Sequence, residues 1–208
     1  MKLRGIYAIT DSALTPGEEL LTAAQQALAG GISLLQYRDK GGSRQHRLSQ
    51  AKALQALCAE FDVPLLINDD VQLCLEAGAA GVHLGQSDTD IGRAREILGP
   101  QAIIGVTCHA ALELAEKAQR AGASYVAFGR FFPSLSKPEA SAANLEVLTR
   151  ARKQLALPIA AIGGINQDNA AEVMAAGADL LAVINYLFST KDVAGRARGL
   201  SSLFHQAN

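Results

Sequence analysis

A short segment with an amide and two cations suits a negatively charged ligand. It reads Gln36-Tyr37-Arg38-Asp39-Lys40. In an extended chain every second side chain points the same way, so Gln36, Arg38 and Lys40 are expected to converge. Such a group suits a polyphosphate, because Arg and Lys pair well with phosphate oxygens. A solvated strand end that binds nothing is an equally good interpretation of this segment alone.

Aspartates in two further segments are candidate ligands for a divalent cation. Asp69 and Asp70 follow Asn68, and Asp88 and Asp90 follow a second apolar segment. Carboxylates at the ends of neighbouring strands can share Mg²⁺, which prefers oxygens from carboxylates, phosphates and water. Acids at these places can instead cap helices, which would stabilise each helix by about 0.3–1 kcal/mol. We expect Asp69 and Asp88 to be metal ligands. Asp70 and Asp90 are expected to be caps.

A cysteine next to a histidine, Cys108-His109, suggests a nucleophile with its base. Adjacent residues of a strand point to opposite faces, so these two side chains are poorly placed to act together. We therefore expect Cys108 to be a small buried residue. His83, which lies inside an apolar segment, is expected to be a hydrogen-bonded core residue.

A loop with several hydroxyl groups covers residues 129–138. It carries Ser134, Ser136 and Lys137 between two prolines. This composition favours an anion clamp, and residues 131–138 are expected to close as a lid when substrate binds.

Two glycines, Gly163 and Gly164, provide a second candidate anion site. Their exposed backbone N–H groups are typical of a phosphate site, as is the helix expected to begin near Asn185. A side chain at Gly164 is expected to block the approach of a phosphate to the chain.

Eight short apolar segments recur along the chain, and many of their residues are β-branched. They cover residues 5–10, 33–38, 64–69, 81–85, 103–108, 125–129, 158–164 and 180–185. Several are continuously apolar, as expected for parallel strands covered on both faces. Between them the apolar spacing is helical, for example at 43–61, where Ser43 is the expected N-cap, and at 110–121.

The order of these segments predicts the fold. Gly78, Gly122 and Gly177 are expected to end helices in the left-handed conformation, ahead of a strand. Eight strand–helix units in 208 residues predict an α/β fold, a single-domain (β/α)8 TIM barrel over residues 1–208. A doubly wound open sheet is the alternative, but it would need a glycine-rich fingerprint after the first strand, where Thr10-Asp11-Ser12-Ala13 stands instead. In a barrel, the polar residues described above gather at the carboxyl ends of the strands.

The composition narrows the class of protein. Nineteen Lys and Arg against 20 Asp and Glu give a formal net charge of −1, so no global basic field favours nucleic-acid binding. The longest apolar run, at 180–188, is too short to span a membrane, and the first residues predict no signal peptide. Three scattered cysteines, Cys58, Cys74 and Cys108, fit a reducing cytoplasm. We expect a cytoplasmic protein without a nucleic-acid or membrane partner.

Taken together, these motifs resemble the thiamine phosphate synthase (thiamine-phosphate pyrophosphorylase) family. The resemblance runs from Tyr7 to Asn185 and is most specific at residues 36–40, 67–69 and 81–88 and from 128 to 137. It implies a Mg²⁺-dependent transferase of thiamine biosynthesis. The ring nitrogen of 4-methyl-5-(2-hydroxyethyl)thiazole phosphate, or of its carboxylated form, would attack the methylene of 4-amino-2-methyl-5-hydroxymethylpyrimidine diphosphate. The products would be thiamine monophosphate and pyrophosphate.

The resemblance also implies roles for individual residues. Asp69 and Asp88 would bind Mg²⁺. The leaving pyrophosphate would be stabilised by Arg38, Lys40 and Lys137. The pyrimidine diphosphate would be bound by Gln36, Tyr37, Arg38, Asp39, Lys40, Asn68, Thr107 and Lys137. The thiazole phosphate would be bound by Ser134, Leu135, Ser136, Gly164, Ile184 and Asn185.

The implied reaction needs no general base, because the attacking ring nitrogen is already a nucleophile. It needs stabilisation of the leaving group and exclusion of water while positive charge develops on the pyrimidine methylene. Thr107, Ser134 and Ser136 keep the hydroxyl that the family has at these places, whereas Asn185 replaces a frequent serine. The partners would be the two small-molecule substrates, and the sequence leaves open whether copies assemble into a homo-oligomer.

Two other functions stay open at this point. A thiazole tautomerase is a related barrel in which His109 would act as acid and base, but it needs no diphosphate site. A non-catalytic barrel that binds a phosphate ligand is the second alternative. The carboxylates of Asp69 and Asp88 favour the synthase over both.

Overall fold

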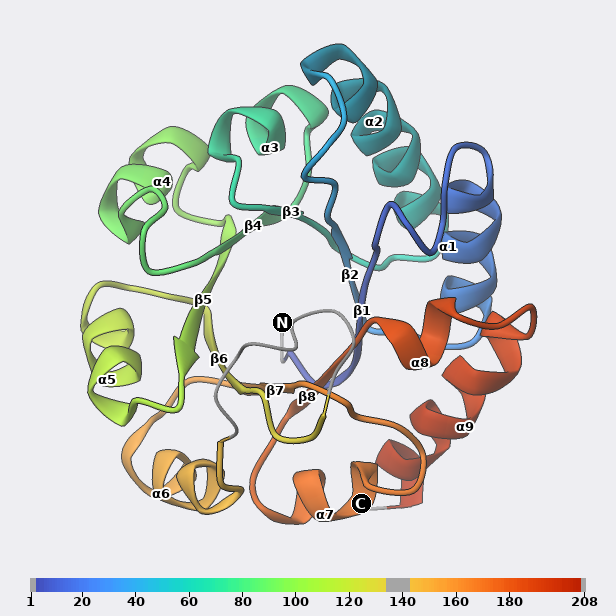
Figure 1. Cartoon of the computed structure of the whole chain (residues 1–208). Coiled ribbons are helices and arrows are strands. Elements are labelled where there is room, and N and C mark those ends of the chain that lie inside the picture. The colour runs from blue at the N-terminus through green and yellow to red at the C-terminus, as the bar shows by residue number, and fades with distance from the viewer. Residues whose placement is uncertain (1–2, 134–142, 207–208) are drawn as a thin grey trace.

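Eight parallel strands close into a barrel in the computed structural model, which describes residues 3–133 and 143–206. The strands follow one another around the ring in sequence order, and the last pairs with the first, with Gly5 opposite Leu180. Helices surround this ring on the outside (Figure 1). The predicted single-domain (β/α)8 barrel is therefore confirmed.

The elements alternate along the chain. The strands are β1 (Gly5–Ile9), β2 (Leu34–Tyr37), β3 (Leu65–Asn68), β4 (Gly81–Leu84), β5 (Ile103–His109), β6 (Tyr125–Gly129), β7 (Ile159–Ile162) and β8 (Leu180–Val183). The helices are α1 (Glu19–Ala29), α2 (Arg44–Glu60), α3 (Val71–Ala77), α4 (Ile91–Leu98), α5 (Leu112–Arg120), α6 (Glu146–Gln154), α7 (Ala170–Ala175), α8 (Asn185–Phe188) and α9 (Val193–Gln206).

Some strands end at other residues than the sequence predicted. β7 ends at Ile162, because the glycines that follow have positive φ angles, 63° at Gly164, and turn the chain. β8 ends at Val183, because Asn185 already begins α8. β5 runs one residue further than expected, to His109, through a shift of its register against β6.

The apolar residues form two separate cores, one inside the barrel and one between the strands and the helices. In β1, Tyr7 and Ile9 belong to the inner core, whereas Ile6 and Ala8 belong to the outer core. This alternation follows from the two-residue period of a strand. The bulkiest fully buried side chains of the inner core are Tyr7 and Tyr125, whose hydroxyl groups need polar partners there.

Several helix ends have the caps that the sequence predicted. The side chains of Ser43, Asp70 and Asp90 each accept a backbone hydrogen bond from the first turn of the helix that follows, α2, α3 and α4 respectively. Gly78 ends α3 in the left-handed conformation, and the two other predicted helix-ending glycines also have positive φ. Within residues 3–133 and 143–206, no helix combines the length and apolar character needed to cross a membrane.

Candidate active site

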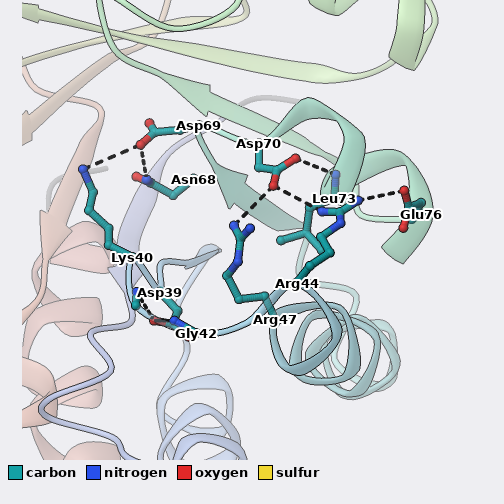
Figure 2. Close-up of polar contacts among 11 residues, drawn as sticks. Asp39, Lys40, Gly42, Arg44, Arg47, Asn68, Asp69, Asp70, Leu73 and Glu76 are labelled. Carbon is teal, nitrogen blue, oxygen red and sulfur yellow. Dashed lines mark hydrogen bonds and ion pairs between the residues drawn. The ribbon is translucent and has the colours of Figure 1, made fainter.

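Two carboxylates meet at the carboxyl ends of β3 and β4. Asp69 directly follows β3, and Asp88 lies in the loop after β4; we call them the acidic pair. Lys40 Nζ lies 3.8 Å from Asp69 Oδ2, and Asn68 Nδ2 donates a hydrogen bond to the same oxygen at 2.6 Å (Figure 2). Burial and the Asp88 carboxyl raise the pKa of Asp69, although Lys40 and Asn68 oppose this effect. The two predicted metal ligands therefore lie close enough to repel each other.

The chemistry of the acidic pair fits a magnesium ion. Mg²⁺ is usually held by one or two carboxylates, with substrate phosphates and water as the other ligands. In the part of the chain that the structure describes, no group of three or more His, Cys, Asp or Glu side chains is suited to a metal ion. A cation at the acidic pair would thus take its remaining ligands from substrate and water. It would also relieve the repulsion that raises the pKa of Asp69.

The neighbouring residue Asp70 serves the helices instead. Its carboxylate accepts hydrogen bonds from Arg44 and Arg47 of α2, each at 3.2 Å (Figure 2). Arg44 also pairs with Glu76 of α3 at 2.7 Å. These two arginines neutralise the Asp70 carboxylate, which also caps α3. The prediction that Asp70 is a helix cap is therefore confirmed.

Gln36, Arg38 and Lys40 do not converge as their alternation predicted. β2 ends at Tyr37, so the two-residue period of the strand stops before the two cations. Gln36 is buried inside the barrel. Arg38 forms an ion pair with Asp11 at 3.3 Å, and of the three residues Lys40 is the one that contacts the acidic pair.

Tyr37 and Asp39, two of the predicted pyrimidine diphosphate ligands, each have hydrogen-bond partners within the protein. Tyr37 packs in the outer core, and its hydroxyl donates to Gln50 Oε1 of α2 at 2.8 Å. Asp39 accepts hydrogen bonds from the N–H groups of Gly41 and Gly42, at 2.9 and 3.1 Å. Burial opposes these two bonds, but they lower the pKa of Asp39. Tyr37 faces outward because it directly follows inward-facing Gln36 on the strand.

A chain of hydrogen bonds inside the barrel links two of the predicted pyrimidine ligands. Gln36 Nε2 donates to the Tyr7 hydroxyl, which lies 2.8 Å from the Tyr125 hydroxyl. The Tyr125 hydroxyl lies 2.7 Å from His83 Nδ1, and His83 Nε2 lies 2.8 Å from Thr107 Oγ1. We call these five residues the interior chain. His83 is hydrogen-bonded as predicted, but it is partly buried and belongs to neither hydrophobic core.

Sequence reasoning did not identify Tyr7 and Tyr125 as members of the interior chain. The available signal was their polar hydroxyl at inward positions of strands, because a buried tyrosine needs a hydrogen-bond partner. Their rings meet edge to face, with centroids 5.8 Å apart. This contact joins β1 to β6 across the barrel interior.

A cavity of about 370 Å³ lies at the carboxyl ends of β7 and β8. Its lining includes Gly164, Ile184 and Asn185, three of the predicted thiazole phosphate ligands. It also includes Arg196 of α9, which was not predicted because it lies on a helix with no motif around it. Arg196 lies over the ring of Tyr186, 4.8 Å from its centroid, and donates to the Tyr186 carbonyl at 2.6 Å. The cavity thus combines backbone groups, an amide and a cation.

Gly164 is needed for a reason that the sequence did not reveal. A Cβ at this position would lie 2.5 Å from the Pro133 carbonyl oxygen and 2.7 Å from Phe132 Cβ. A side chain would therefore collide with the segment after β6 before it blocked a phosphate. The next residues of that segment are the predicted clamp and lid, and they lie outside the described residues: Ser134, Leu135, Ser136 and Lys137.

Cys108 and His109 differ in exposure, as their opposite orientation on β5 predicted. Cys108 is fully buried in the outer core, and burial raises the pKa of its thiol to about 12. Almost none of the nucleophilic thiolate is therefore present at neutral pH. His109 is exposed, so the two residues do not form a catalytic pair.

Comparison with known proteins gives consistent matches over the whole barrel. The family model described as thiamine monophosphate synthase matches residues 6–187. A thiamine-phosphate synthase from Marinobacter nauticus is 53% identical over 202 residues, which are 96% of this chain and 90% of that relative. A solved structure of thiamine phosphate pyrophosphorylase from Pyrococcus furiosus matches with a TM-score of 0.90 and 34% identity, over 99% of this chain and 97% of that chain. A second such structure, from Bacteroides thetaiotaomicron, has a TM-score of 0.70 and 18% identity over 100% of both chains, and it supports the fold alone.

Proposed function

This chain belongs to the thiamine monophosphate synthase family, and we propose how its barrel mouth makes thiamine phosphate. The protein is a transferase of thiamine biosynthesis. The aminopyrimidine ring binds over the interior chain, where Gln36 and Thr107 orient it. The diphosphate of this substrate binds beside Lys40, Asn68 and the acidic pair. The thiazole phosphate binds in the cavity at the ends of β7 and β8.

The observation that carries this proposal is the acidic pair with Lys40 and Asn68 beside it. Two carboxylates that repel each other are unfavourable in a protein that binds nothing there, since the repulsion raises the pKa of Asp69. A cation bound between the two carboxylates and a diphosphate would offset this repulsion and hold the substrate at the same time. The separate cavity provides the second binding place that a two-substrate reaction requires.

The residues of this site support a substitution at the pyrimidine methylene carbon. When bound by Asp69 and Asp88, Mg²⁺ supplies charge neutralisation for the pyrophosphate leaving group. The thiazole ring nitrogen forms a bond to the methylene carbon, the bond from that carbon to the diphosphate oxygen breaks, and its electron pair leaves with pyrophosphate. Lys40 contributes positive charge where the negative charge develops. No side chain has to remove a proton, so Cys108 and His109 have no part in the step.

Neutralising one metal ligand tests the proposal. Asp88 accepts a hydrogen bond from Gly85 N–H at 2.6 Å, and Asp88→Asn keeps an oxygen for that bond while it removes the charge. Formation of thiamine monophosphate and pyrophosphate is measured over a range of Mg²⁺ concentrations. We expect a loss of about 100-fold at limiting Mg²⁺, which corresponds to roughly 3 kcal/mol of charge stabilisation.

Asp90→Asn is the matched control, because Asp90 caps α4 and asparagine caps a helix about as well. It should stay close to wild type at every Mg²⁺ concentration. The proposal is wrong if wild-type protein forms no thiamine monophosphate from the two substrates. It is also wrong if Asp88→Asn keeps wild-type activity at low Mg²⁺. Isomerised thiazole without pyrophosphate in the same assay would indicate a tautomerase.

We also propose a cytoplasmic location. Cys58, Cys74 and Cys108 are all free and buried, which fits a reducing compartment. Assembly into a homo-oligomer stays a prediction. Light scattering tests it by comparing the mass of the particle in solution with the 21.8 kDa of one chain.

A further inference from the structure

The hydrogen atoms of the interior chain can be placed by counting donors and acceptors. The amide nitrogen of Gln36 only donates, so the Tyr7 oxygen accepts its bond. Tyr7 then has one hydrogen to give, and the Tyr125 oxygen at 2.8 Å accepts it. Tyr125 in turn gives its single hydrogen to His83 Nδ1 at 2.7 Å.

The hydrogen bond between His83 and Thr107 has the same donor-to-acceptor direction. Because Nδ1 accepts, the neutral imidazole carries its hydrogen on Nε2, which donates to Thr107 Oγ1 at 2.8 Å. The hydroxyl hydrogen of Thr107 is then left to donate to another molecule. At the other end, Gln36 gives one amide hydrogen to Tyr7, and its amide oxygen is the acceptor that no bond of the interior chain uses.

The opposite direction leaves a buried hydrogen without a partner. If Tyr125 donated to Tyr7, the Tyr7 oxygen would receive hydrogens from both Gln36 and Tyr125, and its own would have no acceptor in the interior chain. Tyr7 is 1% exposed and Tyr125 is 0% exposed, so bulk water cannot accept it. Burial raises the pKa of both tyrosines well above the ordinary value, so each keeps its hydrogen. The stacked rings of His83 and Tyr125, 5.6 Å apart, hold the imidazole in place.

We propose that the interior chain fixes His83 as the Nε2–H tautomer and thereby presents Thr107 as a donor and Gln36 as an acceptor to the pyrimidine ring. This inference rests on the proposed binding of the pyrimidine over the interior chain. Tyr125 and His83 are positioning residues that act through Thr107.

The resulting pattern selects an aminopyrimidine. The amino group of such a ring donates a hydrogen bond, and its ring nitrogens accept, which matches an acceptor at Gln36 and a donor at Thr107. A pyrimidine with a carbonyl in place of the amino group reverses the pattern, because the carbonyl accepts and the neighbouring ring nitrogen carries a hydrogen. Discrimination between these two rings therefore depends on the direction of the hydrogen bonds inside the barrel.

Nitrogen-15 NMR of the ligand-free protein tests the tautomer without any substrate. The chain has four histidines, and a His83→Gln sample identifies the signals of His83. Wild-type His83 should show the Nε2–H pattern. Tyr125→Phe keeps the ring and removes the hydroxyl, so Nδ1 loses its donor and Thr107 can donate to Nε2. In that variant the Nδ1–H tautomer should gain population.

Steady-state kinetics test the effect on recognition. Tyr125→Phe should raise KM for the pyrimidine diphosphate about tenfold, the effect of one lost hydrogen bond, and leave KM for the thiazole phosphate unchanged. Thr107→Val should raise the same constant, and Thr107→Ser, which keeps the hydroxyl, should restore it. The double variant should be no worse than Thr107→Val alone, because Tyr125 acts through Thr107. Tyr125→Phe should also lose preference for the amino substrate over its oxo analogue.

Several results would overturn this inference. One is a wild-type His83 with its hydrogen on Nδ1, which decides the matter even if Tyr125→Phe does not fold. Others are an unchanged tautomer in Tyr125→Phe, an equal rise of both KM values, or fully additive effects with Thr107→Val. If wild-type protein forms no thiamine monophosphate, the proposed function fails, whereas the NMR result still decides the tautomer.

Discussion

Asp69 occupies an unfavourable place for two reasons. Its φ is 62°, in the left-handed region that few residues other than glycine adopt, although aspartate and asparagine enter it more readily than most. Its carboxyl also faces Asp88, and burial together with that charge raises its pKa above the ordinary 3.8. The backbone N–H of Asp69 donates to the His83 carbonyl at 2.8 Å, which fixes the turn after β3. Strain of this kind persists at functional sites when the surrounding structure holds it.

Removing the charge of Asp69 should stabilise the metal-free protein and abolish its activity. Because the pKa of Asp69 is raised by folding, its contribution to stability is lost as pH rises from 3.8 through the raised value. The Asp69→Asn variant has no carboxyl to ionise here, so its stability does not fall in this way as pH rises. Asparagine also tolerates a positive φ. Thermal melts without divalent metal should show a higher Tm for the variant at neutral pH and a smaller difference in acid. The same difference at both pH values would contradict this explanation.

Cys108 should be dispensable for the reaction. Burial raises the pKa of its thiol to about 12, so it is neither a nucleophile nor a good target for alkylation in the folded protein. Cys108→Ala should keep wild-type kcat/KM and lose about 1 kcal/mol of stability from the smaller buried side chain. Activity assays and urea denaturation measure the two effects. A loss of activity beyond the loss of folded protein would restore a catalytic role for this residue.

At the scale of elements, β5 makes room for the interior chain. Gly105 lies in the middle of this strand, and a Cβ there would overlap the ring of Tyr125. Tyr125 is fully buried and held by hydrogen bonds, so its ring has nowhere to move. The absence of a side chain at Gly105 of β5 is thus required for the contact between His83 of β4 and Tyr125 of β6.

Gly105→Ala should therefore disturb both stability and recognition. The extra methyl group overpacks the inner core, which typically costs about 1–3 kcal/mol, and pushes Tyr125 away from His83. Urea denaturation and KM for the pyrimidine diphosphate are the measurements. Gly92→Ala in α4 is the control, because a Cβ there meets only the Asp90 carboxylate, at 3.0 Å. Equal stability of both variants would show that the inner core adapts around Tyr125.

The positions of the strands and helices could be predicted from the sequence, but some of their ends could not. Burial imposes periods of two and of about 3.6 residues, so the strands and the helix at 43–61 could be located from apolar spacing. The end of β2 could not, because Arg38 suits an extended strand and a loop equally well. The cap at Asp70 was predictable because a helix follows it directly. The bond between Tyr7 and Tyr125 joins residues 118 positions apart, and no local pattern records such a contact.

At the scale of the whole molecule, the two proposed substrate sites lie on different parts of the ring. The acidic pair follows β3 and β4, and the cavity with Gly164 and Asn185 follows β7 and β8. The barrel between them fixes their separation, because all eight strands are bonded to their neighbours. Ligands that bind only the folded ring should therefore stabilise the chain as one unit.

Mg²⁺ with pyrophosphate should raise the melting temperature of the wild-type protein. At 100 times the dissociation constant a ligand adds about 2.7 kcal/mol, which for a chain of this size raises Tm by roughly 5–10 °C. Differential scanning fluorimetry with Mg²⁺ alone, pyrophosphate alone and both together measures this shift. The largest shift should need both and should disappear in Asp88→Asn. A full shift in that variant would place the binding of Mg²⁺ and pyrophosphate elsewhere.

The closed order of the strands also determines how the backbone exchanges hydrogen with solvent. An open sheet frays from its outer strands, whereas each strand from β1 to β8 has a neighbour on both sides. Amide hydrogens of the strands should therefore be replaced by deuterium through one common opening of the ring, with similar exchange free energies. Amides of the outer helices should exchange earlier and one helix at a time. Slow exchange would thus trace the circle of strands in Figure 1 as a single kinetic unit.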